Sequence, residues 1–334
     1  MTLPSTSTST AVRVNVVVPV FNKRQLLERA IGSIVAAADA FGGADIRLVD
    51  NGSTDGSLEL LRQRFANAAT ILVLPNATIG AVRNFGAKLG AAEIISFLDC
   101  DCLVPSDFFS ILLEVFERTG AAAAGRRIVL PPSPTWVEAT WDQMHQDGLD
   151  GERTWINSAN LAVRRDAFER AGGFDEALVT GEDAELCQRI LLNGGKIMQD
   201  QRLAVAHLDN AKTLGAFYRK ERWRGLGMFG TVSSIAVDKP TAMTFLHLGL
   251  TCAAAAILVA APLGWIARAA LALALLLTVP ALTVLYRKRS SVHRFNVVRA
   301  ALLYELYFLG RLNALLLIVV RGTLARLRRS PRAA

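Results

Sequence analysis

Short apolar runs alternate with amphipathic stretches over the first third of the chain. Four runs are rich in β-branched residues and bounded by polar turns, as buried strands are; they read VNVVVPV, IRLVD, TILVLP and EIISFLD. Apolar residues at helical spacing follow each run and predict helices at Arg24–Phe41, Ser57–Phe65, Ala81–Ala92 and Pro105–Thr119. Four such strand–helix units predict an α/β fold whose sheet is mostly parallel and covered by helices on both faces.

The pattern loosens after residue 130, where the segment PPSPTW interrupts it and opens a stretch that holds Trp136, Trp141 and Trp155. Order resumes with WINSANLAVRRDAF, a helix predicted at Asp183–Leu192, the strand-like run IMQDQRLAVAHL and a helix near Leu214–Trp223. The first ten residues are rich in serine and threonine, so we expect residues 1–12 to be disordered. They lack the basic and apolar pattern of a leader, and we expect no secretory signal.

Two long uncharged runs follow the α/β pattern. From Pro240 to Ala267 the sequence has no Asp, Glu, Lys or Arg, and Ala269–Tyr286 is equally uncharged. Each run can cross a hydrocarbon core of about 30 Å, which needs roughly 20 apolar residues. We therefore predict a transmembrane hairpin whose tight turn is the segment PLGW.

A third apolar stretch, Phe295–Val320, differs because Arg299, Glu305 and Arg311 interrupt it. Charged side chains are costly inside a bilayer, so we expect this stretch to lie in the interface or to pack against other helices. The chain is thus predicted to have five parts. They are a disordered N-terminus (1–12), an α/β domain (13–235), a transmembrane hairpin (240–286), a third interfacial or packed helix (295–321) and a basic tail (322–334).

The charge of the chain is concentrated in its last quarter. The formal net charge is +8, and 52% of the residues are hydrophobic. From Gly264 onward there are twelve Lys or Arg and one acid, a net of +11, whereas residues 1–263 carry 25 bases and 28 acids, a net of −3. Bases beside apolar helices favour an anionic membrane surface, and we expect no nucleic-acid partner.

The four cysteines do not form a disulfide framework, because their spacing is irregular and none stands in a CxxC pair. This usage is typical of a reducing compartment, so we expect the α/β domain to lie in the cytosol. The cysteines are Cys100, Cys102, Cys187 and Cys252.

Acidic residues stand where predicted strands end. Asp50 ends IRLVD, and Asp99 and Asp101 follow EIISFL in the sequence FLDCDC. The carboxyl ends of parallel strands meet at one edge of a sheet, where ligands bind, so these acids are expected to lie on the same edge. The loop NGSTDGS after Asp50 either presents backbone N–H groups to an anion or nucleotide, or forms an ordinary N-cap turn.

The sequence FLDCDC places two thiols and two carboxylates together. A thiolate zinc site needs four soft ligands, and this CxC has no second CxxC or HxxxH partner in the chain. Carboxylates together with phosphate oxygens suit a hard ion such as Mn²⁺ or Mg²⁺. We therefore expect Asp99 and Asp101 to be the ligands and the thiols to pack in the core.

These acids stand within a longer ordered set of motifs. The set comprises VVVPVFN (Val16–Asn22), VDNGSTDGS (Val49–Ser57), IGAVRNFGAKLGAAEIISFLDCD (Ile79–Asp101), NSANLAVRRDAFERAGGFDE (Asn157–Glu176) and GEDAELCQRI (Gly181–Ile190). Together they resemble the family 2 glycosyltransferases, inverting enzymes of the Rossmann-like GT-A fold that use nucleotide sugars. The resemblance covers about residues 13–230 and implies a GT-A domain followed here by C-terminal transmembrane helices.

The resemblance implies roles at a nucleotide-diphosphate sugar site. Pro19 and Phe21 are expected to line the nucleotide site, Asp50 to contact the base, and Arg83 to lie near the nucleotide. Such a donor site would bind a Mn²⁺ or Mg²⁺ ion as cofactor.

The metal site implied by the resemblance contains Asp99 and Asp101, which would hold ribose, metal and diphosphate. His207, in LAVAHL, matches the place where many relatives carry a metal or diphosphate ligand. A lone histidine after an apolar run is equally typical of a satisfied core residue, so both interpretations of His207 remain open.

The acceptor side is implied by the pair Glu182 and Asp183. The resemblance places the catalytic base in this pair, and we expect it to be Asp183, with Glu182 as a supporting or acceptor-binding partner. A helix N-terminus also favours acids for structural reasons, and the two interpretations are compatible.

The sequence departs from the processive members of the family. Their QxxRW signature is replaced by RKERW at Arg219–Trp223, and two or three membrane segments are too few to enclose a polysaccharide channel. We expect transfer of one sugar to a lipid-linked or other glycan acceptor, at a bacterial-type inner membrane with the catalytic domain in the cytoplasm.

Two other classes of function compete with this one. A non-catalytic scaffold on a degenerate nucleotide-sugar-binding domain is disfavoured because Asp50, Asp99, Asp101 and Asp183 are all present. A nucleotidyltransferase would be expected to carry a glycine-rich basic loop after the first strand, and VVPVFNKRQ contains no glycine.

Overall fold

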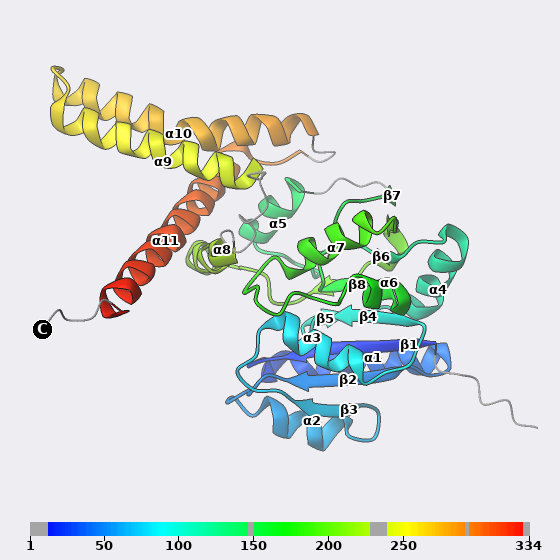
Figure 1. Cartoon of the computed structure of the whole chain (residues 1–334). Coiled ribbons are helices and arrows are strands. Elements are labelled where there is room, and N and C mark those ends of the chain that lie inside the picture. The colour runs from blue at the N-terminus through cyan, green and yellow to red at the C-terminus, as the bar shows by residue number, and fades with distance from the viewer. Residues whose placement is uncertain (1–12, 146–149, 228–238, 291–293, 330–334) are drawn as a thin grey trace, which may run out of the picture. The chain divides into compact units, whose positions relative to one another are not determined.

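The computed structural model describes residues 13–145, 150–227, 239–290 and 294–329 (Figure 1). These residues form two compact units. The sheet unit comprises residues 13–129, 150–177 and 182–208, and the helical unit comprises 130–145, 178–181, 209–227, 239–290 and 294–329. The expected disorder of residues 1–12 and the end of the basic tail lie outside the described residues, and the predicted domain boundaries stay predictions.

A single large sheet organises the sheet unit. Among the described residues it has eight strands, in the order β3-β2-β1-β4-β8-β6-β9-β7. Its first half is parallel throughout, as the sequence predicts, with β1 pairing to β2 and β4 and β2 pairing to β3. The strands of this half are β3 (Thr70–Val73), β2 (Asp45–Asp50), β1 (Val14–Val20) and β4 (Ile94–Leu98).

The second half of the sheet begins with a reversal of direction. Strand β8 pairs antiparallel with both β4 and β6, with Asn160 opposite Leu98. The residues before β8 therefore lie at the same sheet edge as those after β4. The strands of this half are β8 (Asn160–Arg164), β6 (Ala123–Gly125), β9 (Ile197–Gln199) and β7 (Gly151–Glu152).

A small two-stranded sheet lies beyond the end of β4. Strand β5 (Cys102–Leu103) pairs antiparallel with β10 (Ala206–His207), which places His207 opposite Cys102. This pairing brings a residue far along the chain next to the turn after β4.

The core lies on both faces of the sheet. All seven residues of β1 are buried, and its side chains alternate between two apolar clusters: Val16 and Val18 in one and Val17 in the other. A strand covered on both faces reads as a continuous apolar run, which is the pattern in the sequence. The helices are α1 (Arg24–Phe41), α2 (Ser57–Phe65), α3 (Ile79–Lys88), α4 (Phe108–Thr119), α6 (Arg165–Arg170) and α7 (Glu182–Leu192).

Two predicted helices start more than one residue away from the predicted position. Helix α3 starts at Ile79 rather than Ala81, because the Thr78 hydroxyl caps it by accepting the Ala81 N–H, and it ends at Lys88. Helix α4 starts at Phe108 rather than Pro105, after a turn in which the Phe108 N–H bonds to the Pro105 carbonyl.

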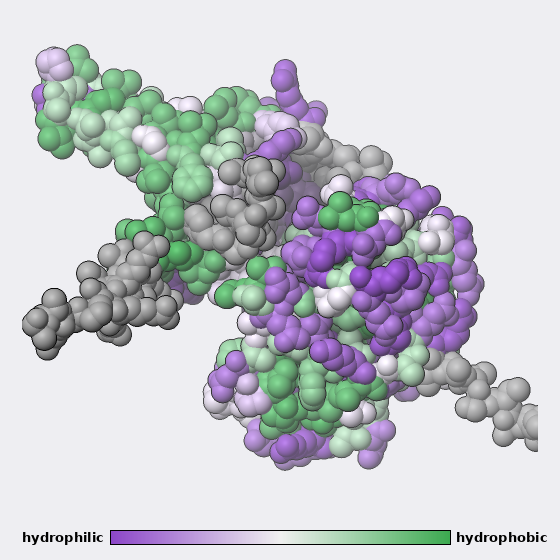
Figure 2. Space-filling view, in the orientation of Figure 1, coloured by the Kyte–Doolittle hydropathy of each residue, from purple (hydrophilic) through white to green (hydrophobic). Residues whose placement is uncertain are grey.

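The helical unit contains three helices long and apolar enough to cross a membrane, among the residues described. Their candidate spans are Lys239–Ala260, Trp265–Arg289 and Val297–Val320, with mean hydropathy 2.0, 2.2 and 1.6. Apolar surface runs along α9 and α10 in Figure 2, which fits membrane segments. The helices of this unit are α5 (Trp136–Gln143), α8 (Leu214–Gly227), α9 (Lys239–Ala260), α10 (Trp265–Ser290) and α11 (Val297–Arg329).

Helix α11 packs closely on the charged helix α8. A Cβ atom at Gly310 would lie 3.0 Å from the Arg222 nitrogen and 3.1 Å from the Tyr218 carbonyl oxygen, so the two backbones touch at this glycine. Glu221, only 1% exposed, lies 3.6 Å from the Arg311 guanidinium. Arg311, one of the three charges that interrupt the apolar pattern of α11, is therefore paired with α8 inside this unit.

Substitution of Gly310 by leucine should force α8 and α11 apart, because the new side chain meets backbone atoms that cannot rotate away. Overpacking of this kind costs roughly 1–3 kcal/mol, so the detergent-solubilised protein should melt at a lower temperature. The matched control is Gly249→Leu on α9, where a Cβ atom meets nothing within 4 Å. Equal melting temperatures for the two variants would contradict the close crossing.

Candidate active site

The turn after β4 separates the thiols from the carboxylates of FLDCDC. Cys100 and Cys102 belong to the core cluster, and the Cys102 thiol donates to the Ala159 carbonyl at 3.6 Å. Burial raises the pKa of both thiols well above the ordinary value, so they stay protonated. A neutral, enclosed thiol is a poor metal ligand, which leaves the carboxylates for that purpose.

Asp99, Asp101 and His207 form a cluster that can bind a metal ion. One ligand atom from each lies within 4.8 Å of the other two. The His207 Nε2 is 3.2 Å from the Asp101 Oδ1, and the histidine is 6% exposed. The strand pair β5–β10 holds this geometry, because the Leu208 N–H also donates to the Asp101 carbonyl at 2.9 Å.

Two carboxylates and an imidazole are ligands that Mn²⁺ and similar divalent ions accept. The sequence left two interpretations of His207 open. Burial of the side chain is consistent with a core residue, whereas its Nε2, which is directed at the Asp101 carboxylate, fits a metal ligand.

Lys23 was missed by the sequence analysis. It lies three residues after β1, at the N-cap of α1, and its Nζ is 3.3 Å from the Asp101 Oδ2. Its backbone N–H donates to the Ser57 hydroxyl, which ties it to the start of α2. A basic residue in the loop after a central strand, in VFNKRQ, was the available signal.

Arg83 joins the metal-binding cluster to the acidic pair on α7. Its Nη2 lies 2.9 Å from the Asp99 Oδ1 and its Nη1 lies 2.7 Å from the Glu182 Oε1. The residue is 3% exposed and its guanidinium sits over the Phe174 ring at 5.7 Å. Burial opposes its charge, but Asp99 and Glu182 outweigh burial and raise the pKa of Arg83.

Glu182 and Asp183 begin α7 and are held differently. Glu182 is bound by Arg83, and the Ser158 hydroxyl donates to its Oε1 at 3.4 Å. Burial raises the pKa of Glu182, and Arg83 offsets part of that rise. Asp183 accepts backbone N–H groups instead, from Ser158 to Oδ2 at 3.1 Å and from Ala184 to Oδ1 at 2.8 Å.

Ser158 was also missed, although it stands in the quoted motif NSAN. It precedes β8, and the reversal of that strand brings it to the edge where β4 ends. No local sequence pattern marks this contact, because it depends on the pairing of distant strands.

Asp50 ends β2 and is fully buried. Its Oδ1 accepts the N–H groups of Gly52 and Ser53 at 2.9 and 3.0 Å. Its Oδ2 has no hydrogen-bond partner among the described residues. The loop NGSTDGS supplies the N-cap of α2 at Gly56, as the N-cap interpretation predicts, and Asp50 itself is not that cap.

Pro19 and Phe21 lie at the end of β1, next to Asp50. Pro19 is buried within the strand, whereas Phe21 is 54% exposed. The register places Val20 beside Asp50. The loops after β1 and β2 are bonded together, since the Asn22 side-chain oxygen accepts the Thr54 N–H at 2.8 Å.

The structure thus brings six of the predicted site residues together, by ion pairs and hydrogen bonds within two groups and by the proximity of the Asp99, Asp101 and His207 ligand atoms between them. These are Arg83, Asp99, Asp101, Glu182, Asp183 and His207, with Ser158 as a bridge in the acidic pair. The other three predicted residues lie at the carboxyl ends of β1 and β2, and Lys23 connects that loop to Asp101.

Comparison with known families identifies the class of this site. The family described as Glycosyl transferase family 2 matches residues 15–172. The related Glycosyl transferase family group 2 matches residues 94–286, which is more than half of the chain. The chain belongs to the family 2 glycosyltransferases, and its α/β domain has the GT-A fold.

Curated relatives are similar at a moderate level. Glycosyltransferase AglE of Haloferax volcanii is 26% identical over 54% of this chain and 62% of its own length. Succinoglycan biosynthesis protein ExoA of Rhizobium meliloti is 27% identical over 64% and 67%. Pre-mycofactocin glycosyltransferase of Mycobacterium tuberculosis is 26% identical over 68% and 48%. The chain therefore spans between about half and two thirds of the length of these relatives.

A solved structure supports the fold. Mannosyltransferase PcManGT from Pyrobaculum calidifontis superposes with a TM-score of 0.60 at 20% identity, over 91% of this chain and 88% of that one. That structure is a complex with GDP-Man and Mn²⁺.

We expect the carboxylates rather than the thiols to control metal binding. Asp101→Asn should weaken Mn²⁺ binding at least about tenfold, because it removes a charged ligand from the cluster. Cys100→Ser is the matched control one residue away and should leave the affinity unchanged. Titration of free Mn²⁺ by its electron paramagnetic resonance signal measures both. Loss of Mn²⁺ affinity in Cys100→Ser but not in Asp101→Asn would mean that the thiols bind the metal.

Proposed function

We propose that this protein is a membrane-bound inverting glycosyltransferase that moves one sugar from a nucleotide-diphosphate sugar to a lipid-linked or other membrane-delivered acceptor. The observation that supports this most is the continuous set of contacts from Asp101 and His207 through Asp99 and Arg83 to Glu182 and Asp183. The cluster Asp99–Asp101–His207 suits a metal and a diphosphate, and the neighbouring carboxylates Glu182 and Asp183 suit an acceptor hydroxyl.

The nucleotide is proposed to bind at the ends of β1 and β2. The unpartnered Oδ2 of Asp50 can accept a base N–H, and the exposed Phe21 ring can cover the base. Pro19 shapes the strand end from which Phe21 projects. These contacts suit any nucleobase with an N–H donor at its edge, which leaves the choice among uridine, guanosine and thymidine donors to experiment.

The diphosphate and its metal are proposed to bind at Asp99, Asp101 and His207. These residues would hold Mn²⁺ or Mg²⁺, which would supply Lewis-acid stabilisation of the charge that develops on the leaving diphosphate. Lys23 lies on the same carboxylate and can pair with a phosphate oxygen. Arg83 stays charged beside Asp99 and contributes a further positive group.

Asp183 is the proposed base. In an inverting transfer the acceptor hydroxyl attacks the anomeric carbon opposite the leaving nucleotide, so a carboxylate must take its proton. Burial raises the pKa of Glu182, but its Oε1 is already bound by the Arg83 guanidinium at 2.7 Å and is not free to receive an acceptor hydroxyl. Asp183 has no arginine partner among the described contacts: its Oδ2 accepts the N–H and the hydroxyl of Ser158, and its Oδ1 accepts the Ala184 N–H alone and keeps a lone pair for the acceptor.

Asp183→Asn should leave nucleotide-sugar binding nearly unchanged while lowering turnover by roughly 10²–10⁴-fold, as expected for loss of a general base. Glu185→Gln, on the same helix but paired with Arg189, is the control and should keep its turnover. Normal turnover in Asp183→Asn with loss in Glu182→Gln would reverse the assignment. Normal turnover in both would place the base elsewhere.

The function itself is tested by donor binding followed by transfer. Purified protein with Mn²⁺ is screened against UDP-, GDP- and dTDP-sugars for thermal stabilisation; a ligand at a hundred times its dissociation constant adds about 2.7 kcal/mol. GDP-mannose is the first candidate, because the structural neighbour PcManGT was solved with it. Transfer of radiolabelled sugar to a lipid extract then supports the proposal, whereas donor binding without transfer or hydrolysis would favour the scaffold alternative.

The membrane orientation is also a proposal. The basic residues Arg287, Lys288 and Arg289 close α10 and favour the cytoplasmic side, so the hairpin α9–α10 has both ends inside a bacterial-type inner membrane. Helix α11 packs along the charged α8, which disfavours a position across the bilayer. The catalytic domain and the basic C-terminus are thus both cytoplasmic.

A topology reporter fused after Ala334 should read as cytoplasmic, because export of the basic tail opposes the positive-inside bias. A second fusion in the turn PLGW, at Leu263, is the matched control and should read as extracytoplasmic. An extracytoplasmic signal at Ala334 would mean that α11 crosses the membrane.

A further inference from the structure

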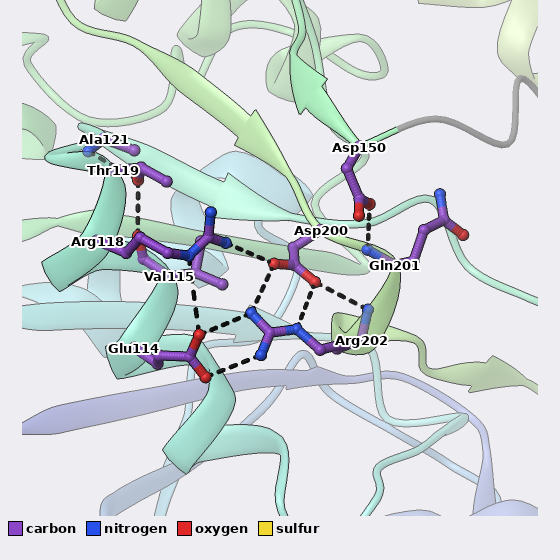
Figure 3. Close-up of polar contacts among 9 residues, drawn as sticks. All are labelled: Glu114, Val115, Arg118, Thr119, Ala121, Asp150, Asp200, Gln201 and Arg202. Carbon is purple, nitrogen blue, oxygen red and sulfur yellow. Dashed lines mark hydrogen bonds and ion pairs between the residues drawn. The ribbon is translucent and has the colours of Figure 1, made fainter.

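The segment that carries His207 is held by an ion-pair network outside the active site. After β9 the chain forms a short 3-10 helix, Gln201–Leu203, and then enters β10 with His207. Figure 3 shows Asp200 and Arg202, at the start of this segment, facing Glu114 and Arg118 of helix α4.

Asp200 is the centre of the network. It is 4% exposed, and its Oδ2 accepts Arg118 Nη2 and Arg202 Nη2, each at 2.9 Å. Its Oδ1 caps the 3-10 helix by accepting the Arg202 N–H at 3.0 Å, and it also accepts Arg202 Nε at 3.0 Å. The hydrogen bonds from Arg202 lower the pKa of Asp200 despite its burial, so the carboxylate is charged at neutral pH.

Arg202 connects this carboxylate to helix α4. Its guanidinium also binds Glu114 in a fork, with Nη1 to Oε2 at 2.8 Å and Nη2 to Oε1 at 3.0 Å (Figure 3). Forked arginine–carboxylate pairs fix orientation as well as distance. Glu114 and Arg118 are half exposed, and such pairs alone contribute little. Because Arg118 and Arg202 both bind the buried Asp200, these ion pairs together restrain the position of the segment on α4.

The backbone of the same segment is held independently. The Gln201 N–H donates to Asp150 at 2.6 Å, and the Asp200 N–H donates to the Gly125 carbonyl at 3.2 Å. The Asn160 side chain donates to the Leu203 carbonyl at 2.7 Å. Only three residues separate Leu203 from His207 in the sequence, so a displacement of the 3-10 helix is transmitted directly to β10.

We propose that Asp200 and Arg202 are positioning residues that hold His207 within reach of Asp101, and so set the affinity of the Asp99–Asp101–His207 cluster for a divalent cation. Metal ligands must keep their distances within about 0.2 Å; the pairing with β5 and the bond from the His207 N–H to the Val129 carbonyl hold β10 itself, and the ion-pair network fixes the segment that leads into it. The inference rests on the proposed metal site. It adds that the metal affinity of the site depends on ion pairs with helix α4, made by residues that contact neither metal nor substrate.

The experiment measures Mn²⁺ affinity of the full-length protein in detergent, by electron paramagnetic resonance of free Mn²⁺, without nucleotide sugar and well below the melting temperature. Asp200→Asn and Arg202→Met should each weaken binding by about 10–100-fold, the usual effect of losing a group that orients a ligand. Glu117→Gln is the control, since it removes the exposed partner of Arg13 on the same helix α4. Unchanged affinity in both Asp200→Asn and Arg202→Met would overturn the inference.

A double substitution separates positioning from general destabilisation. In a His207→Ala background, Asp200→Asn should cause no further loss of affinity, because the group it positions is gone. An equal loss with and without His207 would overturn the inference. The Asp101→Asn variant tests the metal site separately from the positioning role of Asp200. If it abolishes Mn²⁺ binding while Asp200→Asn has no effect, the metal site stands and the positioning role fails; if Asp101→Asn binds Mn²⁺ normally, the proposed metal site fails as well.

Discussion

A buried arginine between two carboxylates is the constraint on which this site depends. Arg83 comes from α3, Asp99 from the end of β4 and Glu182 from the start of α7, so one guanidinium fixes three elements. Charges are costly to bury unless they are paired, and breaking such a pair typically destabilises a protein by about 3–5 kcal/mol. The acids of the site can therefore be brought together without mutual repulsion only while Arg83 stays between them.

The reversal of one strand makes this convergence possible. In a wholly parallel sheet the residue before a strand lies at the opposite edge from the residue after its neighbour. Because β8 runs antiparallel to β4, Ser158 lies beside the end of β4 and reaches the acidic pair on α7. The parallel half of the sheet presents Asp50 and Asp99, and the reversed strand adds the support for Glu182 and Asp183 to the same edge.

Sequence patterns predicted the features that depend on local physics. The continuous apolar runs of β1 and β4 and the strand-end positions of Asp50 and Asp99 are confirmed by the sheet. Strands β6 and β7 were not predicted, because three and two residues are too few to show a period. Lys23 and Ser158 were missed because their importance comes from partners 78 and 25 residues away. The roles of the individual site residues follow from resemblance and remain predictions.

The enclosure of the thiols has a consequence for chemical durability. Oxidation and alkylation act on the thiolate, and burial raises the pKa of Cys187 to about 12, with Cys100 and Cys102 also shifted strongly upward. Cys252, the exposed cysteine among the four, lies on the apolar helix α9. The three thiols of the sheet unit are thus shielded from oxidation and alkylation for as long as the unit stays folded.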